Sequence, residues 1–134
     1  MRDAGAVRDW MTRKPATVPE DSSIGAALAR MQGAEIRHLL VVDGDRLSGI
    51  VSSRDLGRLA GDAAAPLLSA PVSRIMTEDP VTVAPETPVT AAARVLLEMK
   101  IGALPVRDGD DIVGIFTTAD ALEALLTTVD GPGA

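Results

Sequence analysis

The feature that most constrains the fold of this chain is an internal repeat. The segment VRDWMTRKPATV, which starts at Val7, aligns with VSRIMTEDPVTV, which starts at Val72, and the offset of 65 residues (72 − 7) continues without a gap. Met11 thereby aligns with Met76, and the turn at Asp43–Asp45 aligns with Asp108–Asp110. A fixed offset kept in register over a whole copy indicates one structural unit used twice.

Each copy predicts the same order of elements: helix, strand, helix, two strands joined by a tight Asp-Gly turn, and a closing helix. A unit of about 55 residues buries too little surface to be comfortably stable alone. We therefore expect an α/β (α+β) fold in which two repeats are related by a pseudo-twofold axis. Each repeat would hold a small three-stranded sheet packed with flanking helices.

The starts of the helices are marked in the sequence. Ser22 or Ser23 is expected to cap the helix of the first copy, and Thr87 that of the second copy, with Pro88 at the first helical position. In the first of these helices Ile24, Ala27, Leu28 and Met31 recur at helical spacing and predict a buried stripe. The closing helices are expected to begin at Ser52 and at Thr117. The domain boundaries that follow are 7–60 and 72–127 for the two repeats, 61–71 for a linker and 128–134 for a flexible tail.

Composition excludes several classes of function. The chain has no cysteine and one histidine, so thiolate and multi-histidine metal sites and cysteine nucleophiles are excluded, and we expect no metal. The net charge of −6 disfavours binding to a nucleic-acid backbone. The N-terminus has no apolar core of signal-peptide length, and no apolar stretch is long enough to span a bilayer. We expect a cytoplasmic protein without nucleic-acid or membrane partners.

A motif of the form G-h-x-[S/T]-x-x-D, in which h is apolar, closes each copy. It reads Gly49–Asp55 in the first and Gly114–Asp120 in the second. Because a strand feeds directly into a helix there, free backbone N–H groups and the positive helix end favour an anion, and the hydroxyl can donate to a phosphate oxygen. The aspartate would repel a phosphate and suits an uncharged diol such as ribose. The same spacing also fits a structural capping box that binds no ligand.

The ordered set of motifs, repeated twice, resembles the paired cystathionine β-synthase (CBS) domains known as a Bateman module. The resemblance covers roughly residues 7 to 126. It implies a regulatory protein, not an enzyme, that binds AMP, ADP, ATP or S-adenosylmethionine in clefts between the repeats, senses cellular energy state and acts on a partner protein. No cofactor is implied beyond an adenine nucleotide, AMP or ATP, as regulatory ligand. The family also implies a homodimer, for which the Ala-rich helices 24–33 and 88–100 are the expected surfaces.

The resemblance implies that the two clefts differ. It pairs the closing motif of one repeat with the first strand and the I-x-x-L segment of the other. The Asp55 motif has cations in Arg37, His38 and Arg54, whereas Gly102, Ala103 and Ala119 leave the Asp120 motif without a phosphate clamp. The expected ligand-binding residues, in which aliphatic side chains accompany the polar ones, are Ala16, Ile36, Arg37, His38, Ile50, Ser52, Arg54, Asp55, Val81, Ile101, Ile115, Thr117 and Asp120.

Two alternatives accompany this hypothesis. A module of the same fold can serve as a dimerisation or protein-interaction platform without binding a nucleotide, in which case Arg37, His38 and Arg54 are ordinary surface residues. Ser52, His38 and Asp55 are also the residue types of a hydrolase triad, but no nucleophile-elbow sequence is present and the motif recurs without a histidine. We therefore expect no catalytic residues. Met11 and Met76 are interpreted as core packing.

Overall fold

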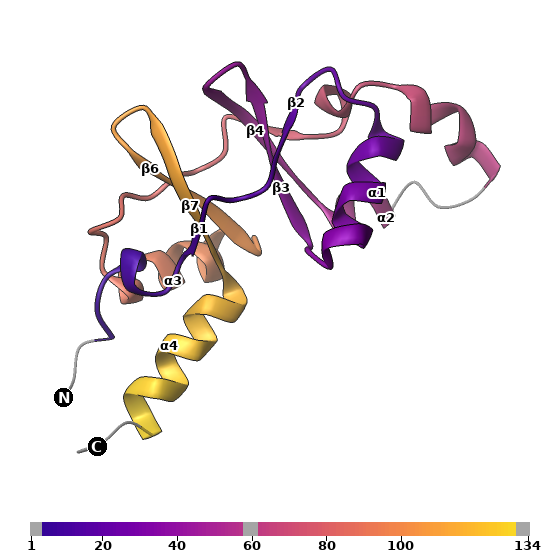
Figure 1. Cartoon of the computed structure of the whole chain (residues 1–134). Helices are drawn as coiled ribbons and strands as arrows, with labels where there is room; N and C mark the ends of the chain where they lie inside the picture. Colours follow the sequence, from indigo (N-terminus) through magenta and orange to yellow (C-terminus); the bar gives the residue numbers. More distant parts are fainter. Residues whose placement is uncertain (1–3, 58–61, 131–134) are drawn as a thin grey trace. The chain divides into compact units, whose positions relative to one another are not determined.

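The computed structural model describes residues 4–57 and 62–130, and the chain forms two compact units (Figure 1). Residues 16–80 form one of them, here called unit 2, whereas residues up to 15 and from 81 onward form unit 1. The leading segment of each sequence repeat thus packs with the body of the other repeat. The compact units are therefore divided differently from the repeats 7–60 and 72–127.

Unit 2 is built on a four-stranded sheet. Its strands are β2 (Thr17–Pro19), β3 (His38–Asp43), β4 (Arg46–Ser52) and β5 (Thr77–Glu78), in the order β2-β3-β4-β5. β2 runs parallel to β3, and the other pairs are antiparallel. The helices α1 (Ile24–Ala34) and α2 (Ser53–Gly57) lie beside β3 and β4, and the 3₁₀ helices η2 (Asp62–Ser69) and η3 (Val72–Arg74) complete the unit (Figure 1).

Unit 1 repeats this plan with a three-stranded sheet. Its elements are η1 (Val7–Asp9), β1 (Thr12–Arg13), α3 (Val89–Met99), β6 (Ala103–Asp108), β7 (Asp111–Thr117) and α4 (Thr118–Asp130), and the strand order is β1-β7-β6. A single parallel bridge from Val83 to Val106 stands where β2 lies in unit 2. The α/β fold class with small sheets and flanking helices is confirmed. The prediction of three strands in each sheet is wrong for unit 2, because β5 adds a fourth strand there.

The predicted helix caps are right for one copy and wrong for the other. Ser23 caps α1, where its side chain accepts a hydrogen bond from the Ala26 N–H. Thr87 does not cap α3: its Oγ1 accepts from the Ala84 N–H at 3.0 Å, inside the preceding turn. Pro88 is the N-cap instead, since its extended backbone (ψ 141°) keeps it outside the helix.

The ends of the closing helices differ from expectation. α4 continues to Asp130 and so enters the segment expected to be a flexible tail. The expected end of the other closing helix, near Ala60, lies outside the described residues. The expected linker contains η2, whose 3₁₀ turns include Pro66.

Each unit has its own hydrophobic core. In unit 1 the core includes Val7, Leu104 and Phe116, and in unit 2 it includes Ile24, Leu39 and Val51, all fully buried. Side chains of this size each contribute about 1.5–3 kcal/mol when they are buried. Met11 belongs to the first core and Met76 packs against the second, which confirms their predicted role in packing.

Candidate functional site

The candidate site of unit 2 lies where β4 passes into α2. The backbone N–H of Ser52 donates to Asp55 Oδ2 at 3.1 Å, and the backbone N–H of Asp55 donates to Ser52 Oγ at 3.2 Å. These two bonds form a reciprocal capping box that holds the serine hydroxyl and the aspartate carboxylate at the start of the helix. Both groups are half-buried, so both still reach solvent.

The junction of β7 and α4 in unit 1 has the same geometry. The Thr117 N–H donates to Asp120 Oδ2 at 2.8 Å, and the Asp120 N–H donates to Thr117 Oγ1 at 3.2 Å. The helices start one residue later than predicted, at Ser53 and Thr118, because Ser52 and Thr117 are the capping residues.

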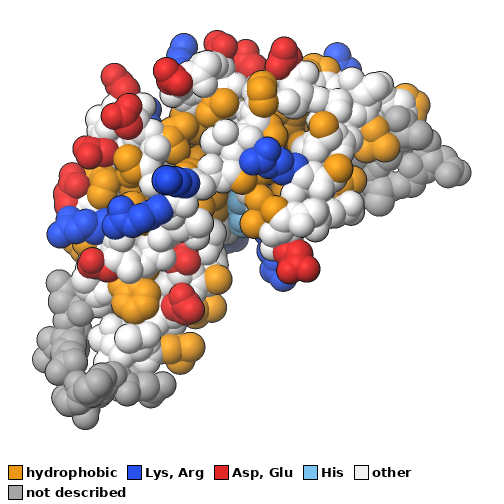
Figure 2. Space-filling view, in the orientation of Figure 1, with side chains coloured by type: hydrophobic (Ala, Val, Ile, Leu, Met, Phe, Trp, Pro, Cys, Tyr) orange, Lys and Arg blue, Asp and Glu red, His pale blue; other side chains and the backbone are white. Residues whose placement is uncertain are grey.

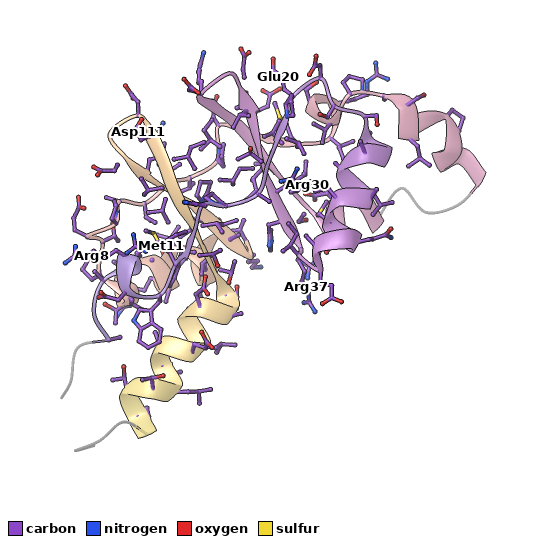
Figure 3. The ribbon with its side chains drawn as sticks, in the orientation of Figure 1. Arg8, Met11, Glu20, Arg30, Arg37 and Asp111 are labelled. Carbon is purple, nitrogen blue, oxygen red and sulfur yellow. The ribbon has the colours of Figure 1, made fainter. Side chains whose placement is uncertain are left out.

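Basic residues lie beside the junction in unit 2. His38 is the partner of Ser52 in the β3–β4 ladder, and the Ser53 N–H donates to the Arg37 carbonyl oxygen at 2.8 Å. Arg37 occupies the loop between α1 and β3 (Figure 3), and its side chain is exposed, as is that of Arg54. The hydroxyl, the carboxylate and three basic residues of the prediction are therefore brought to one end of this sheet.

The corresponding positions in unit 1 carry no charge. Ala103 is the ladder partner of Thr117, and the Thr118 N–H donates to the Gly102 carbonyl oxygen at 3.0 Å. One cation of unit 1, Lys100, was not among the predicted residues; it is the C-cap of α3, has a positive φ of 56° and is exposed. The offset of the repeat places Glu35 at the equivalent position of unit 2, and this comparison of charges would have revealed the lysine.

His38 is held in its neutral form by its surroundings. Burial lowers the pKa of the imidazole below its ordinary value of 6.5, and the nearby Arg37 guanidinium lowers it further. The Asp55 carboxylate raises the pKa of His38 but does not overcome the effect of burial. His38 therefore acts at neutral pH as a hydrogen-bonding group, and Arg37 and Arg54 supply the positive charge.

The register of the sheet separates the candidate residues from the core. Side chains two apart on a strand share a face, so Ile50 and Ser52 lie on one face of β4, and the ladder places His38 on the same face. Val51 and Leu39 lie on the other face, in the core. The same alternation in unit 1 places Ile115 with Thr117 and directs Phe116 into the core.

The remaining apolar candidates differ in their exposure to solvent. Ala16 and Ile36 are half-buried in unit 2, and the Ala16 carbonyl oxygen accepts from the Leu40 N–H of β3 at 3.1 Å. In unit 1, Val81 is 38% exposed, Ile101 is 36% exposed and Ile115 is only 8% exposed. Ile115 thus offers less apolar surface to a ligand than Ile50, which is half-buried.

Acidic side chains gather at the opposite ends of the sheets, over the tips of the hairpins (Figure 2). A shallow pocket of unit 2 lies at this end of β3 and β4, lined by Glu20, Asp43, Arg46, Leu47, Ser48, Met76, Glu78 and Asp79. Four carboxylates and a single guanidinium repel a phosphate. An anionic ligand is therefore favoured at the Arg37 end of β3 and disfavoured in this pocket.

No group of three or more His, Asp or Glu side chains within residues 4–57 and 62–130 is placed to hold a metal ion. Over the same residues, no helix combines the length and apolarity needed to cross a membrane.

Comparison with known proteins places these junctions in a family context. The family model for the CBS domain matches residues 7–60 and 72–127. A CBS domain-containing protein of Dictyostelium discoideum, DDB_G0289609, is 33% identical over 92% of this chain and 93% of its own length. Homoserine O-acetyltransferase of Methanocorpusculum labreanum is 38% identical over 84% of this chain, but this chain spans only 22% of that relative.

Two solved structures with the same fold were determined with adenosine compounds bound. CBSX2, solved in complex with AMP, superposes with a TM-score of 0.81 at 31% identity, over 93% of this chain and 98% of that one. The CBS domain pair of protein MJ0100, solved with 5-methylthioadenosine and S-adenosyl-L-methionine, gives a TM-score of 0.80 at 28% identity, over 93% and 98% of the two chains.

Proposed function

Since the chain belongs to the CBS domain family, we propose that it is a regulatory module that binds an adenosine-containing ligand, with the Asp55 motif as its principal site. AMP, ADP and ATP are the ligands that suit this motif best. Binding would regulate a partner protein in response to nucleotide levels, and the chain itself would carry out no catalysis.

The observation that supports this most is the set of groups at the β4–α2 junction. A phosphate there would meet the N-terminal end of a helix and the Ser52 hydroxyl. The Arg37 guanidinium is near enough to His38, the ladder partner of Ser52, to lower its pKa, and a charge-assisted hydrogen bond from it would be of the stronger kind. Asp55 carries an acceptor that suits the two hydroxyls of ribose, and half-buried Ile50 offers an apolar surface to adenine.

The ligands named for the two solved relatives share one chemical group. AMP carries a phosphate, whereas 5-methylthioadenosine and S-adenosyl-L-methionine do not, so adenosine is the part that all three share. A site that reads adenosine through Asp55 and adds cations from Arg37 and Arg54 would prefer the phosphorylated members. In unit 1 the ladder partner of Thr117 is the uncharged Ala103. The Asp120 motif would therefore bind adenosine with less preference for a phosphate group.

A second candidate function is favoured by a different observation. Both capping boxes are complete without a ligand, which is what a purely structural motif requires. In that case the chain would serve as an interaction module, and nucleotides would leave its stability unchanged.

We also propose that the protein forms a homodimer. Of the alanines expected on the pairing surface, Ala27 and Ala92 are fully buried in the cores of their own units, whereas Ala26, Ala29 and Ala91 are exposed. The most exposed large apolar side chains lie on α3, which is one of the two expected helices, and on α4: Leu97 is 78% exposed, and Leu122, Leu125, Leu126 and Val129 are 53–61% exposed. The four residues of α4 follow the spacing i, i+3, i+4, i+7 and so form one stripe that a second copy would cover.

A thermal-shift screen separates the two functions. AMP, ADP, ATP and S-adenosylmethionine are each added at increasing concentration, with UMP as the control that shares ribose and phosphate but lacks adenine. A ligand present at 100 times its Kd adds about 2.7 kcal/mol to the free energy of unfolding, which raises the melting temperature by several degrees. No shift with any adenosine compound, or an equal shift with UMP, would favour the interaction module.

A further inference from the structure

The chain crosses between the two units twice, and each crossing is attached to a ligand-binding motif. It leaves unit 1 after Pro15 and returns from unit 2 after Pro80. Just before the first crossing, Arg13 of β1 pairs with Gly114, and just before the second, Glu78 of β5 pairs with Gly49. These two glycines open the motifs whose hydroxyls are Thr117 and Ser52.

The glycines are required by the close approach of these short strands. A Cβ atom at Gly49 would lie 2.6 Å from Met76 Sδ and 2.7 Å from the Thr77 carbonyl oxygen. At Gly114 the corresponding distances are 2.6 Å to Met11 Sδ and 2.8 Å to the Thr12 carbonyl oxygen. The methionine could rearrange, but the carbonyl belongs to the backbone, so any side chain at either glycine pushes the short strand away from the motif strand.

The residue between each short strand and the crossing has an unusual backbone conformation. Lys14 has φ 51° and Asp79 has φ 46°, and a proline follows each of them. A non-glycine residue keeps a positive φ only where the surrounding structure holds it there. On the N-terminal side of Lys14 and Asp79, the pairing of β1 and β5 with the motif strands restrains the backbone. On the C-terminal side, the ring of the following proline limits the backbone.

We propose that Gly49 and Gly114 are positioning residues that clamp each crossing segment, residues 76–80 and 11–15, to the strand of a ligand-binding motif. Gly49 lies three residues before Ser52 on the same strand, so a ligand that fixes Ser52 and Asp55 also fixes the strand on which Thr77 and Glu78 are paired. Ligand occupancy in one unit thereby reaches the backbone that leads into the other. This last step rests on the proposed function, whereas the clamp itself does not.

The clamp is tested without ligand by hydrogen exchange of the full chain. Gly49→Ala should speed exchange at the Thr77 and Asp79 amides, which face β4, by roughly tenfold and leave the Thr12 amide unchanged, whereas Gly114→Ala should speed exchange at Thr12 and leave Thr77 and Asp79 unchanged. Gly33→Ala is the matched control, because nothing lies within 4 Å of a Cβ at that position. Equal effects of the two variants on both segments, or no effect on either, would overturn the clamp.

The transmission of ligand occupancy is tested with AMP as the probe. In the wild type, saturating AMP should slow exchange at residues 76–79 as well as at residues 52–55. In Gly49→Ala, where the added methyl group separates the short strand from β4, protection should be confined to residues 52–55. If Gly49→Ala does not fold, the exchange of Gly114→Ala still decides the clamp in unit 1.

The outcomes distinguish the two proposals. Protection of residues 52–55 alone in the wild type overturns the transmission but leaves the binding function intact. If calorimetry detects no binding of AMP, the binding function fails and the transmission fails with it. The clamp is then still decided by the exchange of the ligand-free variants.

Discussion

Ser52 and Asp55 bind each other's backbone: the Ser52 N–H donates to the Asp55 carboxylate at 3.1 Å, and the Asp55 N–H donates to the Ser52 hydroxyl at 3.2 Å. A carboxylate has more acceptor sites than this single bond uses. The capping box therefore orients Asp55 toward the end of the sheet where Arg37 and His38 lie and leaves it able to accept further hydrogen bonds. A structural cap and a ligand site can in this way share the same two side chains.

The cap predicts a loss of stability that does not depend on any ligand. Asp120→Ala removes the acceptor for the Thr117 N–H and should lower the free energy of unfolding by about 1 kcal/mol. Asp120→Asn keeps a side-chain oxygen there and should cost clearly less. Urea unfolding monitored by circular dichroism gives both values, and equal losses for the two variants would contradict the role of the cap.

The Arg37 side chain is expected to contribute to the affinity for phosphorylated ligands but not to the affinity for adenosine. Removing its guanidinium should weaken AMP binding by roughly ten- to a hundredfold, as expected for the loss of one charged hydrogen bond worth about 1.5–3 kcal/mol. The affinity for adenosine, which has no phosphate, should change little.

Calorimetric titration of both ligands measures this difference. Arg46→Ala is the matched control, because Arg46 lies on the same sheet at the opposite end of β4. Equal weakening of AMP and adenosine by Arg37→Ala would show that this residue supports the site without contacting the phosphate.

His38 predicts a dependence of stability on pH. Its pKa is lowered in the folded chain, so the unfolded chain binds the proton more readily once the pH falls below about 6.5. The stabilisation that comes from a neutral His38 is complete above pH 6.5. It should be lost as the pH falls toward the lowered folded pKa.

Urea unfolding at pH 7.5 and pH 5.5 tests this sign. The wild type should lose more stability between these two pH values than His38→Gln, whose side chain does not titrate. A larger loss in His38→Gln than in the wild type would show that the sign is wrong.

The apolar stripe of α4 predicts the state of assembly. Light scattering should give twice the monomer mass of 13.9 kDa at micromolar concentration. Leu125→Asp places a charge within the stripe and should shift the mass to that of the monomer. Thr127→Asp, at an exposed position of the same helix outside the stripe, should leave the dimer intact. A monomer mass for the wild type would contradict this assembly.

Local patterns in the sequence predicted most of the fold. The offset of 65 residues gave the duplicated order of elements, and Ser23 and the two S/T-x-x-D motifs behave as the rules of helix capping require. Thr87 was assigned wrongly because a nearby turn competes for its hydroxyl. Such competition depends on the path of the backbone, which the local pattern does not contain.

The packing of each repeat's leading segment with the body of the other repeat could not be predicted from local patterns either. Thr12 and Thr77 lie in two-residue strands whose partners, Ile115 and Ile50, are far away in sequence. A strand of two residues is too short to show a hydrophobic periodicity. The glycines at positions 49 and 114 were visible, but the reason for them is a contact with a distant carbonyl group.

The claim that an adenosine ligand binds at the Asp55 motif is tested by calorimetric titration of AMP into the wild type, Asp55→Ala and Asp120→Ala, each shown to be folded at the temperature of the titration. We predict that the wild type and Asp120→Ala bind AMP with similar affinity, whereas Asp55→Ala loses binding. Loss of binding in Asp120→Ala with binding retained in Asp55→Ala would show that the unit 1 motif forms the principal site. No binding of AMP to the wild type would contradict the claim altogether.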